Sequence, residues 1–243
     1  MLHYAAWRDE MKKLFNTAVN YIKNNQHCLL LMYWLFQTAW YEVIRLINVD
    51  RDVLLIECSW DESIPFIEWF SFPYCLWFPY IAAVLLLGLC SCRREFLRSM
   101  ALITACMFIP MLFCTIVPNG LPLSIRPDFE TLGRDNWGVW LTKFVYSTDS
   151  PPRSVMPSMH CAVSLSLFYA LLRSEKLKGK PWPKVAGGVL SLLIILATVF
   201  IKQHSVLDLI AGLALSLVTC PLVTLAEYLI DKKKAKKAQT AVQ

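Results

Sequence analysis

Long runs of apolar residues constrain this chain of 243 residues more than any other feature. A helix needs about 17 to 25 mainly apolar residues to cross a bilayer. Six segments reach or approach that length: 28–47, 72–91, 99–118, 157–173, 185–203 and 206–230. We therefore predict an all-α polytopic membrane protein, built as a six-transmembrane-helix bundle.

The composition agrees with a membrane protein. Hydrophobic residues make up 56% of the chain and charged residues only 17%. In soluble domains, about half of the residues are apolar and about a quarter are charged. These values argue against a disordered chain and against a nucleic-acid-binding domain. We therefore expect membrane lipids as partners and no nucleic acid.

Positive charge is unevenly divided between the two predicted sides of the membrane. The N-terminal lead, the segments after the second and fourth spans, and the C-terminal tail together hold 17 of the 24 Lys and Arg residues. Cytoplasmic loops concentrate Lys and Arg, so both termini are predicted to be cytoplasmic. The chain then divides into a lead at 1–26, a membrane domain at 27–231 and a basic tail at 232–243.

Two shorter segments have apolar residues at helical spacing outside the predicted spans. One runs from Trp7 to Ile22 in the lead, and the other from Trp137 to Val145 in an external loop. Both fit amphipathic helices lying at the membrane surface. Packing against other helices fits them equally well.

Two of the four histidines are predicted to meet at the external face. His160 begins the fourth span, and His204 lies in the short turn between the fifth and sixth. The fourth span runs inward and the fifth returns, which brings both histidines to one side. Asp208 follows His204 by four residues, so its carboxylate can bind one ring nitrogen and leave the other free as a nucleophile or base.

Cations and hydrogen-bond donors surround this pair. Arg126, Arg153 and Lys202 lie in the external loops, and Ser158 stands at the start of the fourth span, where backbone N–H groups are free. A phosphoryl group fits this set, with one histidine to attack and one to protonate the leaving oxygen. A single histidine in a membrane helix is more often a packed polar group, so the prediction depends on the joint arrangement.

The nine cysteines form no spacing typical of a zinc site. The cysteines therefore predict no zinc site, and we expect no cofactor.

These residues give the chain a resemblance to the type 2 phosphatidic acid phosphatase superfamily, the lipid phosphate phosphatases. That family's first motif ends in Arg-Pro, which Arg126 and Pro127 match. Its second motif, Pro-Ser-Gly-His, resembles residues 157–160, with Met in place of Gly. Its third contains a His and, four residues later, an Asp, as His204 and Asp208 do. The resemblance covers roughly residues 60–230. Within this range, residues 64–77 resemble the corresponding segment of bacterial members.

The resemblance implies a metal-independent membrane hydrolase acting on a lipid phosphate or diphosphate, of the phosphatidic acid or isoprenyl diphosphate type. It implies that His204 forms a phosphohistidine, that Asp208 orients it and that His160 is the general acid. Arg126 and Ser158 would hold the phosphate. The active site would lie on the extracytoplasmic side of the cell membrane.

Two positions depart from the family pattern. Asn119 stands where the first motif has Lys, and Thr198 stands where the third has Arg. We hypothesise that Lys202 and Arg153 replace these cations. The departures leave two alternatives open: a headgroup phosphotransferase resembling sphingomyelin or inositol phosphorylceramide synthases, and a non-catalytic membrane transporter or scaffold.

Overall fold

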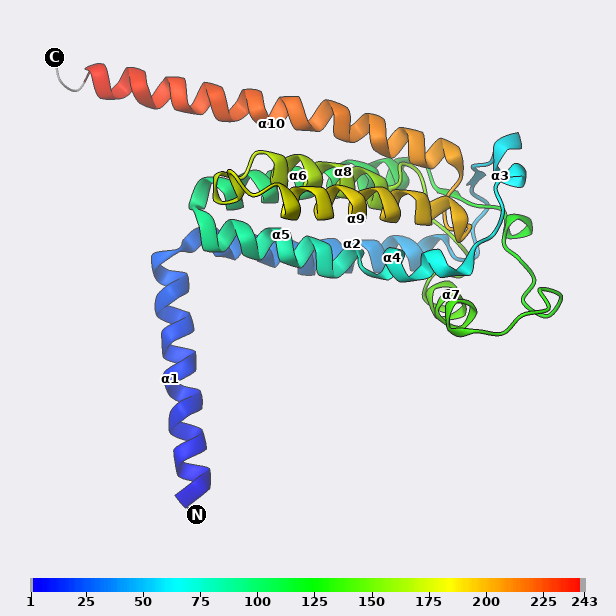
Figure 1. The fold of residues 1–243 in the computed structure, drawn as a ribbon, viewed down its shortest axis with the longest axis horizontal. Coiled ribbons are helices and arrows are strands. Elements are labelled where there is room, and N and C mark those ends of the chain that lie inside the picture. Colours follow the sequence, from blue (N-terminus) through cyan, green and yellow to red (C-terminus); the bar gives the residue numbers. More distant parts are fainter. Residues whose placement is uncertain (1, 241–243) are drawn as a thin grey trace. The chain divides into compact units, whose positions relative to one another are not determined.

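A computed structural model describes residues 2–240, which are mainly helical (Figure 1). The chain forms two compact units that divide between Thr38 and Ala39. The first unit contains α1 (Leu2–Asn24), the 3-10 helix η1 (Gln26–Met32) and the beginning of α2 (Tyr33–Asn48).

Helix α1 coincides with the amphipathic segment predicted in the lead. Its apolar side chains Trp7, Met11, Leu14 and Phe15 are all exposed. The side chains of Ala18, Tyr21 and Ile22, part of the same predicted face, lie outside the described residues.

The second unit contains four helical segments that are long and apolar enough to cross a membrane. They are Glu68–Ser91, α6 (Arg93–Ile116), α9 (Pro181–Phe200) and α10 (Val206–Thr240). The first of them joins η2 (Glu68–Phe70), α4 (Ser71–Cys75) and α5 (Trp77–Ser91). The protein is therefore mainly helical, with four candidate membrane spans within residues 2–240. The remaining predicted spans correspond to the 16-residue α2 and to α8 (Met159–Leu172), which has 14 residues.

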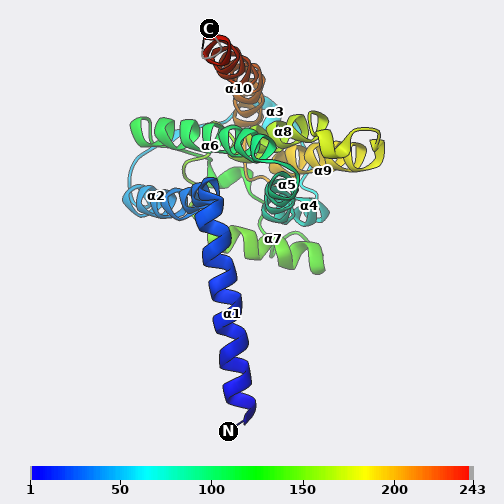
Figure 2. The same cartoon turned by 90° about the vertical axis from the view of Figure 1, so that its left-hand side faces the viewer.

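Helix α8 lies in the middle of the second unit, where it packs against α5, α6, α9 and α10 (Figure 2). Its buried residues occur on all sides of the helix, as expected for an apolar helix surrounded by others. Gly212 allows α10 to approach its beginning closely, because a Cβ there would stand 2.4 Å from the carbonyl oxygen of Ser158.

Several boundaries differ from those predicted. Cys92 alone separates α5 from α6, so the basic segment predicted as a loop forms the first turns of α6. Helix α10 continues through the lysine-rich tail to Thr240. The tail is helical because Ala, Lys and Gln all have high helix propensity.

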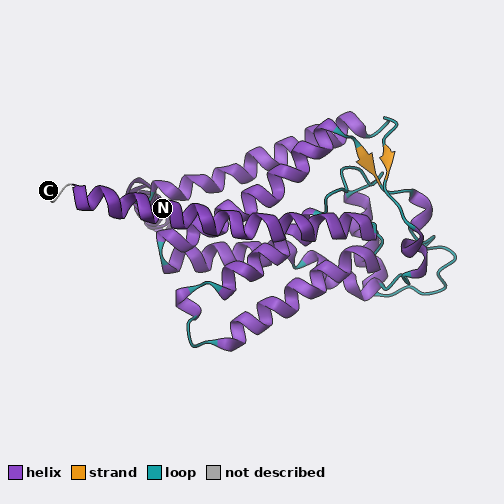
Figure 3. Ribbon diagram, turned by 90° about the horizontal axis from the view of Figure 1, so that it is seen from above, coloured by secondary structure: helices purple, strands orange, loops and turns teal. Residues whose placement is uncertain are grey.

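Short elements gather at the end of the bundle where α8 and α10 begin (Figure 3). Strand β1 (Leu54–Leu55) pairs in parallel with β2 (Asn119–Gly120). The other elements there are α3 (Ser59–Ser63), η3 (Leu123–Ile125) and α7 (Trp137–Thr148). We call this the histidine end. The 3-10 helix η4 (Glu175–Leu177) lies between α8 and α9, at the opposite end.

Helix α7 packs against other helices on one face and is exposed on the other. One of its faces is buried and packs against η2 and α4. The other exposes a row of aromatic rings, since Trp137, Trp140 and Phe144 are 73%, 57% and 55% exposed. Such rings favour the headgroup region of a bilayer.

Candidate active site

His160 lies in the first turn of α8, between aromatic rings of the α4–α5 segment. Its ring centroid is 4.3 Å from that of Tyr74, at an interplanar angle of 23°, and 4.2 Å from that of Trp77. The aromatic contacts fix the plane of the imidazole.

His204 lies in the tight turn that connects α9 to α10. The carbonyl oxygen of Thr198 accepts hydrogen bonds from the backbone N–H groups of Gln203 (2.9 Å) and His204 (3.0 Å). Lys202 has φ 53°, which lets the chain reverse direction immediately after α9. The turn brings the His204 ring to 5.8 Å from that of His160, centroid to centroid.

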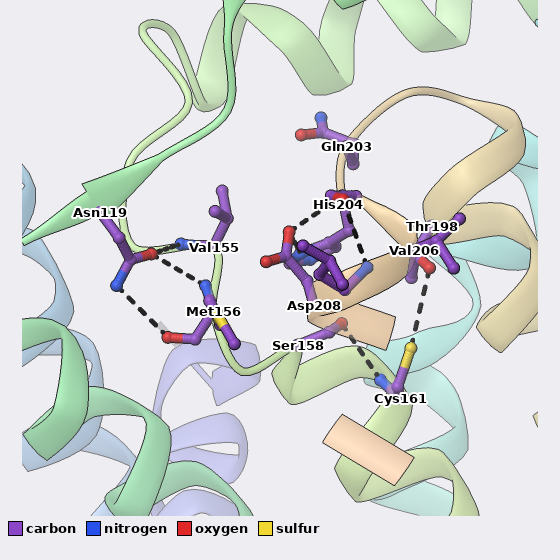
Figure 4. A network of polar contacts seen from close by, with 12 residues as sticks. Asn119, Val155, Met156, Ser158, Cys161, Thr198, Gln203, His204, Val206 and Asp208 are labelled. Carbon is purple, nitrogen blue, oxygen red and sulfur yellow. Dashed lines mark hydrogen bonds and ion pairs between the residues drawn. The ribbon is translucent and has the colours of Figure 1, made fainter. Parts of the chain in front are cut away.

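Asp208 connects the beginnings of α8 and α10 (Figure 4). Its Oδ2 lies 3.4 Å from His204 Nδ1 and accepts a hydrogen bond of 2.9 Å from the Ser205 N–H. Its carbonyl oxygen accepts a hydrogen bond of 3.0 Å from the Ser158 N–H. Because Nδ1 faces Asp208, the other ring nitrogen, Nε2, is the one left for chemistry. Catalytic contacts of this kind are often long before a substrate binds.

The beginning of α8 offers fewer free backbone donors than the sequence suggests. The Ser158 hydroxyl is the N-cap, accepting from the Cys161 N–H at 3.4 Å. The Ser158 N–H is itself engaged by Asp208. Ser158 is completely buried, so its observed contacts fix the helix start.

Arg126 reaches the turn that carries His204. Its Nη2 donates to Gln203 Oε1 at 2.8 Å and lies 3.4 Å from Asp149 Oδ2, while its Nη1 donates to the Asp149 carbonyl oxygen at 3.0 Å. The guanidinium stands 4.1 Å from the ring centroid of Tyr146. Among the predicted cations Arg126, Arg153 and Lys202, Arg126 is thus hydrogen-bonded to Gln203, the residue that precedes the candidate nucleophile His204.

Asp149 adds a partly buried carboxyl that the sequence did not single out. Burial raises its pKa above the usual value, and the nearby positive charge of Arg126 counteracts only part of that effect. The Tyr41 hydroxyl also donates to its Oδ1 at 3.3 Å. The contacts of Asp149 hold Arg126 in place, although desolvation disfavours the ionised form of the carboxyl.

Lys202 and Arg153 make different contacts from those predicted. The Lys202 ammonium donates to the carbonyl oxygens of Asp61 and Ile64, each at 2.5 Å, and burial lowers its pKa. Arg153 Nε donates to the carbonyl oxygen of Asn48 at 3.1 Å. Both cations hold loops together, and neither has a hydrogen bond to the two histidines within residues 2–240.

Asp61, in α3, anchors the beginning of α10. Its Oδ1 accepts from the Val206 N–H at 2.8 Å, and its Oδ2 accepts from the Ser205 hydroxyl at 2.6 Å. A carboxylate is favourable there because it meets unpaired N–H groups and the positive end of the helix dipole. Together with Lys202, it makes the turn before α10 rigid.

The two positions that depart from the family pattern have structural partners. Asn119 Oδ1 accepts from the N–H groups of Val155 and Met156, each at 2.9 Å, and its Nδ2 donates to the Val117 carbonyl (2.9 Å). The Thr198 hydroxyl donates within α9, to the carbonyl oxygen of Ile195. Asn119 therefore joins two loops of the histidine end.

Five buried polar atoms of residues around His160 and His204 have no hydrogen-bond partner among the described residues. They are Trp77 Nε1, Arg126 Nε, Gln203 Nε2, His204 Nδ1 and Asp208 Oδ1. His204 Nδ1 still lies within ion-pair distance of Asp208. Buried polar atoms are normally satisfied, so a group of such atoms indicates a place for a ligand or water.

Sequence reasoning missed Asp61, Tyr74, Trp77, Asp149 and Gln203. Only Gln203 carried a signal, since it immediately precedes His204. The others reach the site from distant loops or helices. Across residues 2–240, the structure contains no group of three or more His, Cys, Asp or Glu side chains that could hold a metal ion.

Comparison with known proteins gives one result that bears on this site. A family model described as the PAP2 superfamily matches residues 54–222, which is more than half of the chain. The matched segment includes Arg126, His160, His204 and Asp208. A search among curated proteins found no match to the chain.

Proposed function

This chain belongs to the PAP2 superfamily, and on that premise we propose that it is a membrane-embedded lipid phosphatase. Its substrate would be a lipid phosphate or diphosphate, of the phosphatidic acid or isoprenyl diphosphate type. The observation that carries the proposal is the approach of the His160 and His204 rings, with Asp208 beside Nδ1 of His204.

In the first step, Nε2 of His204 attacks phosphorus and the bond from phosphorus to the lipid oxygen breaks. His160 gives its proton to that oxygen, so the lipid leaves as an alcohol or as a shorter phosphate. In the second step, water attacks the phosphohistidine, His160 takes up the proton, and the P–N bond breaks to release phosphate. Asp208 holds the His204 ring and stabilises the positive charge that forms on it.

The phosphate oxygens would be held by Arg126, whose guanidinium suits an oxyanion because it presents several donors in one plane. Ser158 stays a proposed phosphate ligand through its hydroxyl, although that oxygen already accepts from the Cys161 N–H. Lys202 and Arg153 remain hypothetical replacements for the missing motif cations, because both are bound to backbone carbonyls here.

A second candidate function is transfer of a phosphorylated headgroup between lipids. The shortage of cations favours it: Asn119 and Thr198 replace two of them, and Arg126 shares its charge with Asp149. A phosphate monoester carries about −1.5 to −2 charge at neutral pH, whereas a phosphodiester carries a single negative charge. One partly neutralised guanidinium therefore matches a phosphodiester donor better, with a lipid hydroxyl replacing water in the second step.

The deciding experiment uses the full chain purified in detergent. Phosphatidic acid, an isoprenyl diphosphate and a phosphodiester lipid are offered with labelled phosphorus, and label is followed into free phosphate and into lipid. His204→Ala should abolish release, while His27→Ala, a histidine of η1, should not. Label that enters a lipid acceptor without free phosphate favours transfer. Equal release by wild type and His204→Ala contradicts both enzymatic functions and leaves a transporter or scaffold.

We also propose that six segments cross the membrane, with both termini cytoplasmic and the histidine end extracytoplasmic. The asymmetry of Lys and Arg supports this orientation. Protease protection of terminal tags in sealed vesicles tests it. Tags accessible from the extracytoplasmic side would contradict it.

The division into a lead at 1–26, a membrane domain at 27–231 and a basic tail at 232–243 also remains a proposal. No metal or other cofactor is assigned a role in either step. Added chelator should therefore leave the activity unchanged, and a loss of activity would overturn this part of the proposal.

A further inference from the structure

Gln203 has an unusual position for an uncharged side chain. It immediately precedes His204, and it is only 1% exposed. Its Oε1 accepts a hydrogen bond of 2.8 Å from Arg126 Nη2, whereas its Nε2 has no partner among the described residues. Figure 4 shows this amide beside the turn that carries His204.

The chemistry of the neighbouring group determines which way the Gln203 amide is turned. A guanidinium has only hydrogen-bond donors, so the atom of the amide that faces Arg126 must be the oxygen. The NH₂ group must then point elsewhere. Two N–H donors are thus fixed in a buried position without an acceptor from residues 2–240.

Arg126 has a free donor of the same kind. Both of its Nη atoms are engaged, by Asp149 and Gln203, but its buried Nε has no partner within the described part of the chain. The two unsatisfied donors belong to side chains that are hydrogen-bonded to each other. A ligand that meets both must present acceptors only, as the oxygens of a phosphoryl group do.

The rest of the site explains why a neutral donor is needed here. Asn119 and Thr198 occupy positions where the family pattern has cations, and both side chains bind within the protein. Lys202 and Arg153 are held by carbonyl oxygens. A phosphoryl group beside His204 would therefore have only Arg126 and the Ser158 hydroxyl as proposed donors unless another side chain supplied one.

We propose that Gln203 is a phosphate-binding residue, whose Nε2 donates to a non-bridging oxygen of the phosphoryl group that Arg126 also binds. This assignment rests on the proposed function, because it concerns the same site. Gln203 thereby supplies a hydrogen-bond donor where the family pattern has a cation, without adding charge. Its Oε1 keeps the guanidinium of Arg126 in place.

Gln203→Glu tests the donor separately from the contact with Arg126. The variant has the same shape and still offers an oxygen to Arg126, but it replaces the NH₂ group with a second acceptor oxygen. The probe is orthovanadate, an analogue of the transferred phosphoryl group, measured as an inhibitor and by its effect on thermal unfolding. A hydrogen bond to a charged group is worth about tenfold to a hundredfold in affinity, so the inhibition constant should rise by at least that factor.

Two further variants complete the test. Gln203→Met removes the donor without adding charge and should weaken orthovanadate binding as well, even if Gln203→Glu does not fold. Gln26→Glu makes the same change of charge at an exposed position of η1 and should leave binding unchanged. Wild-type affinity in a folded Gln203→Glu or Gln203→Met protein overturns the assignment.

The results also separate this assignment from the proposed function. If His204→Ala abolishes phosphate release but the Gln203 variants bind orthovanadate normally, the proposed function stands and the role of Gln203 is wrong. If wild type neither releases phosphate nor binds orthovanadate, both are wrong.

Discussion

The two ends of the helical bundle both bury charged side chains, but they satisfy them differently. At the histidine end, Arg126, Gln203, His204 and Asp208 each retain a buried atom without a hydrogen bond among the described residues. At the opposite end, a group that we call the arginine cluster joins α6, α8 and α10. It consists of Arg94, Arg98, Arg173, Glu227 and Asp231.

The arginine cluster pairs its charges closely. Glu227 accepts from Arg98 Nε at 2.9 Å and lies 3.2 Å from Arg173 Nη1, which itself donates to the Thr224 hydroxyl. Asp231 lies 2.7 Å from Arg94. Glu227 follows Asp208 by nineteen residues, or about 28 Å along α10. Glu227 Oε2 has no hydrogen bond within residues 2–240, but it lies within ion-pair distance of Arg173. The contrast therefore concerns Arg126 Nε and Gln203 Nε2 at the histidine end, which have neither a hydrogen bond nor an ion pair among the described residues.

The difference distinguishes a structural group from a site for a ligand. Buried polar atoms that bond to one another stabilise the fold, whereas atoms left without partners are stabilised only when a ligand or water arrives. We therefore expect substitutions at the histidine end to change activity more than stability. Substitutions in the arginine cluster should do the reverse.

The largest effect is expected for Asp208→Asn. Asparagine keeps the shape and can still accept from the Ser205 N–H, but it cannot stabilise the charged imidazole of His204. By analogy with serine hydrolases, phosphate release should fall by roughly 10³- to 10⁴-fold, with thermal unfolding nearly unchanged. Asp231→Asn, at the other end, is the matched control. Activity within tenfold of wild type would contradict the role of Asp208.

Glu227→Ala should instead destabilise the protein. It leaves Arg98, whose side chain is 7% exposed, without its carboxylate partner. Removing one partner of a buried ion pair costs about 3–5 kcal/mol. Thermal unfolding in detergent should shift accordingly, while the folded fraction keeps its KM. Glu175→Ala, at an exposed carboxylate that pairs only weakly with Lys178, provides the control. If Glu227→Ala greatly lowered activity without lowering stability, the expected difference between the arginine cluster and the histidine end would be wrong.

Asn119→Lys tests whether a motif residue can simply be restored. The substitution removes the acceptor for the N–H groups of Val155 and Met156. Leaving such buried groups unsatisfied costs about 1–3 kcal/mol. We expect lower thermal stability and no gain in phosphate release, with Asn119→Ala giving a similar loss. Higher activity at unchanged stability would show that the position still belongs to the phosphate site.

The smallest effect concerns pH. The pKa of Asp149 is raised in the folded protein, so its contribution to stability is fully present below the usual value of about 3.9 and is lost as pH rises through the raised value. Asp149→Asn should remove this dependence. Measured as thermal unfolding from about pH 4 upward, the variant should gain stability relative to wild type and then level off. A constant difference between the two proteins would contradict the assignment.

Sequence reasoning was most successful where a signal is local. Apolar runs indicated the four long spans. The spacing of His204 and Asp208 predicted that the two side chains lie together on one helix; they lie 3.4 Å apart, but His204 belongs to the turn before α10, which begins at Val206. It was least successful for cations. Nothing near Lys202 in the sequence indicates that its ammonium binds Asp61 and Ile64, because those carbonyl groups belong to α3 and its C-cap, about 140 positions earlier.

The sequence by itself determined that this chain is a helical membrane protein, and its motif residues indicated which histidines to examine. Both depend on short-range properties: hydrophobic run length, charge near the span ends and helical periodicity. Only the tertiary structure decided which donors surround His204. Hydrogen bonds between segments distant in sequence engage Asn119, Lys202 and Arg153, and within residues 2–240 they leave Arg126 Nε and Gln203 Nε2 without a partner. Such long-range pairing has no period and no fixed spacing.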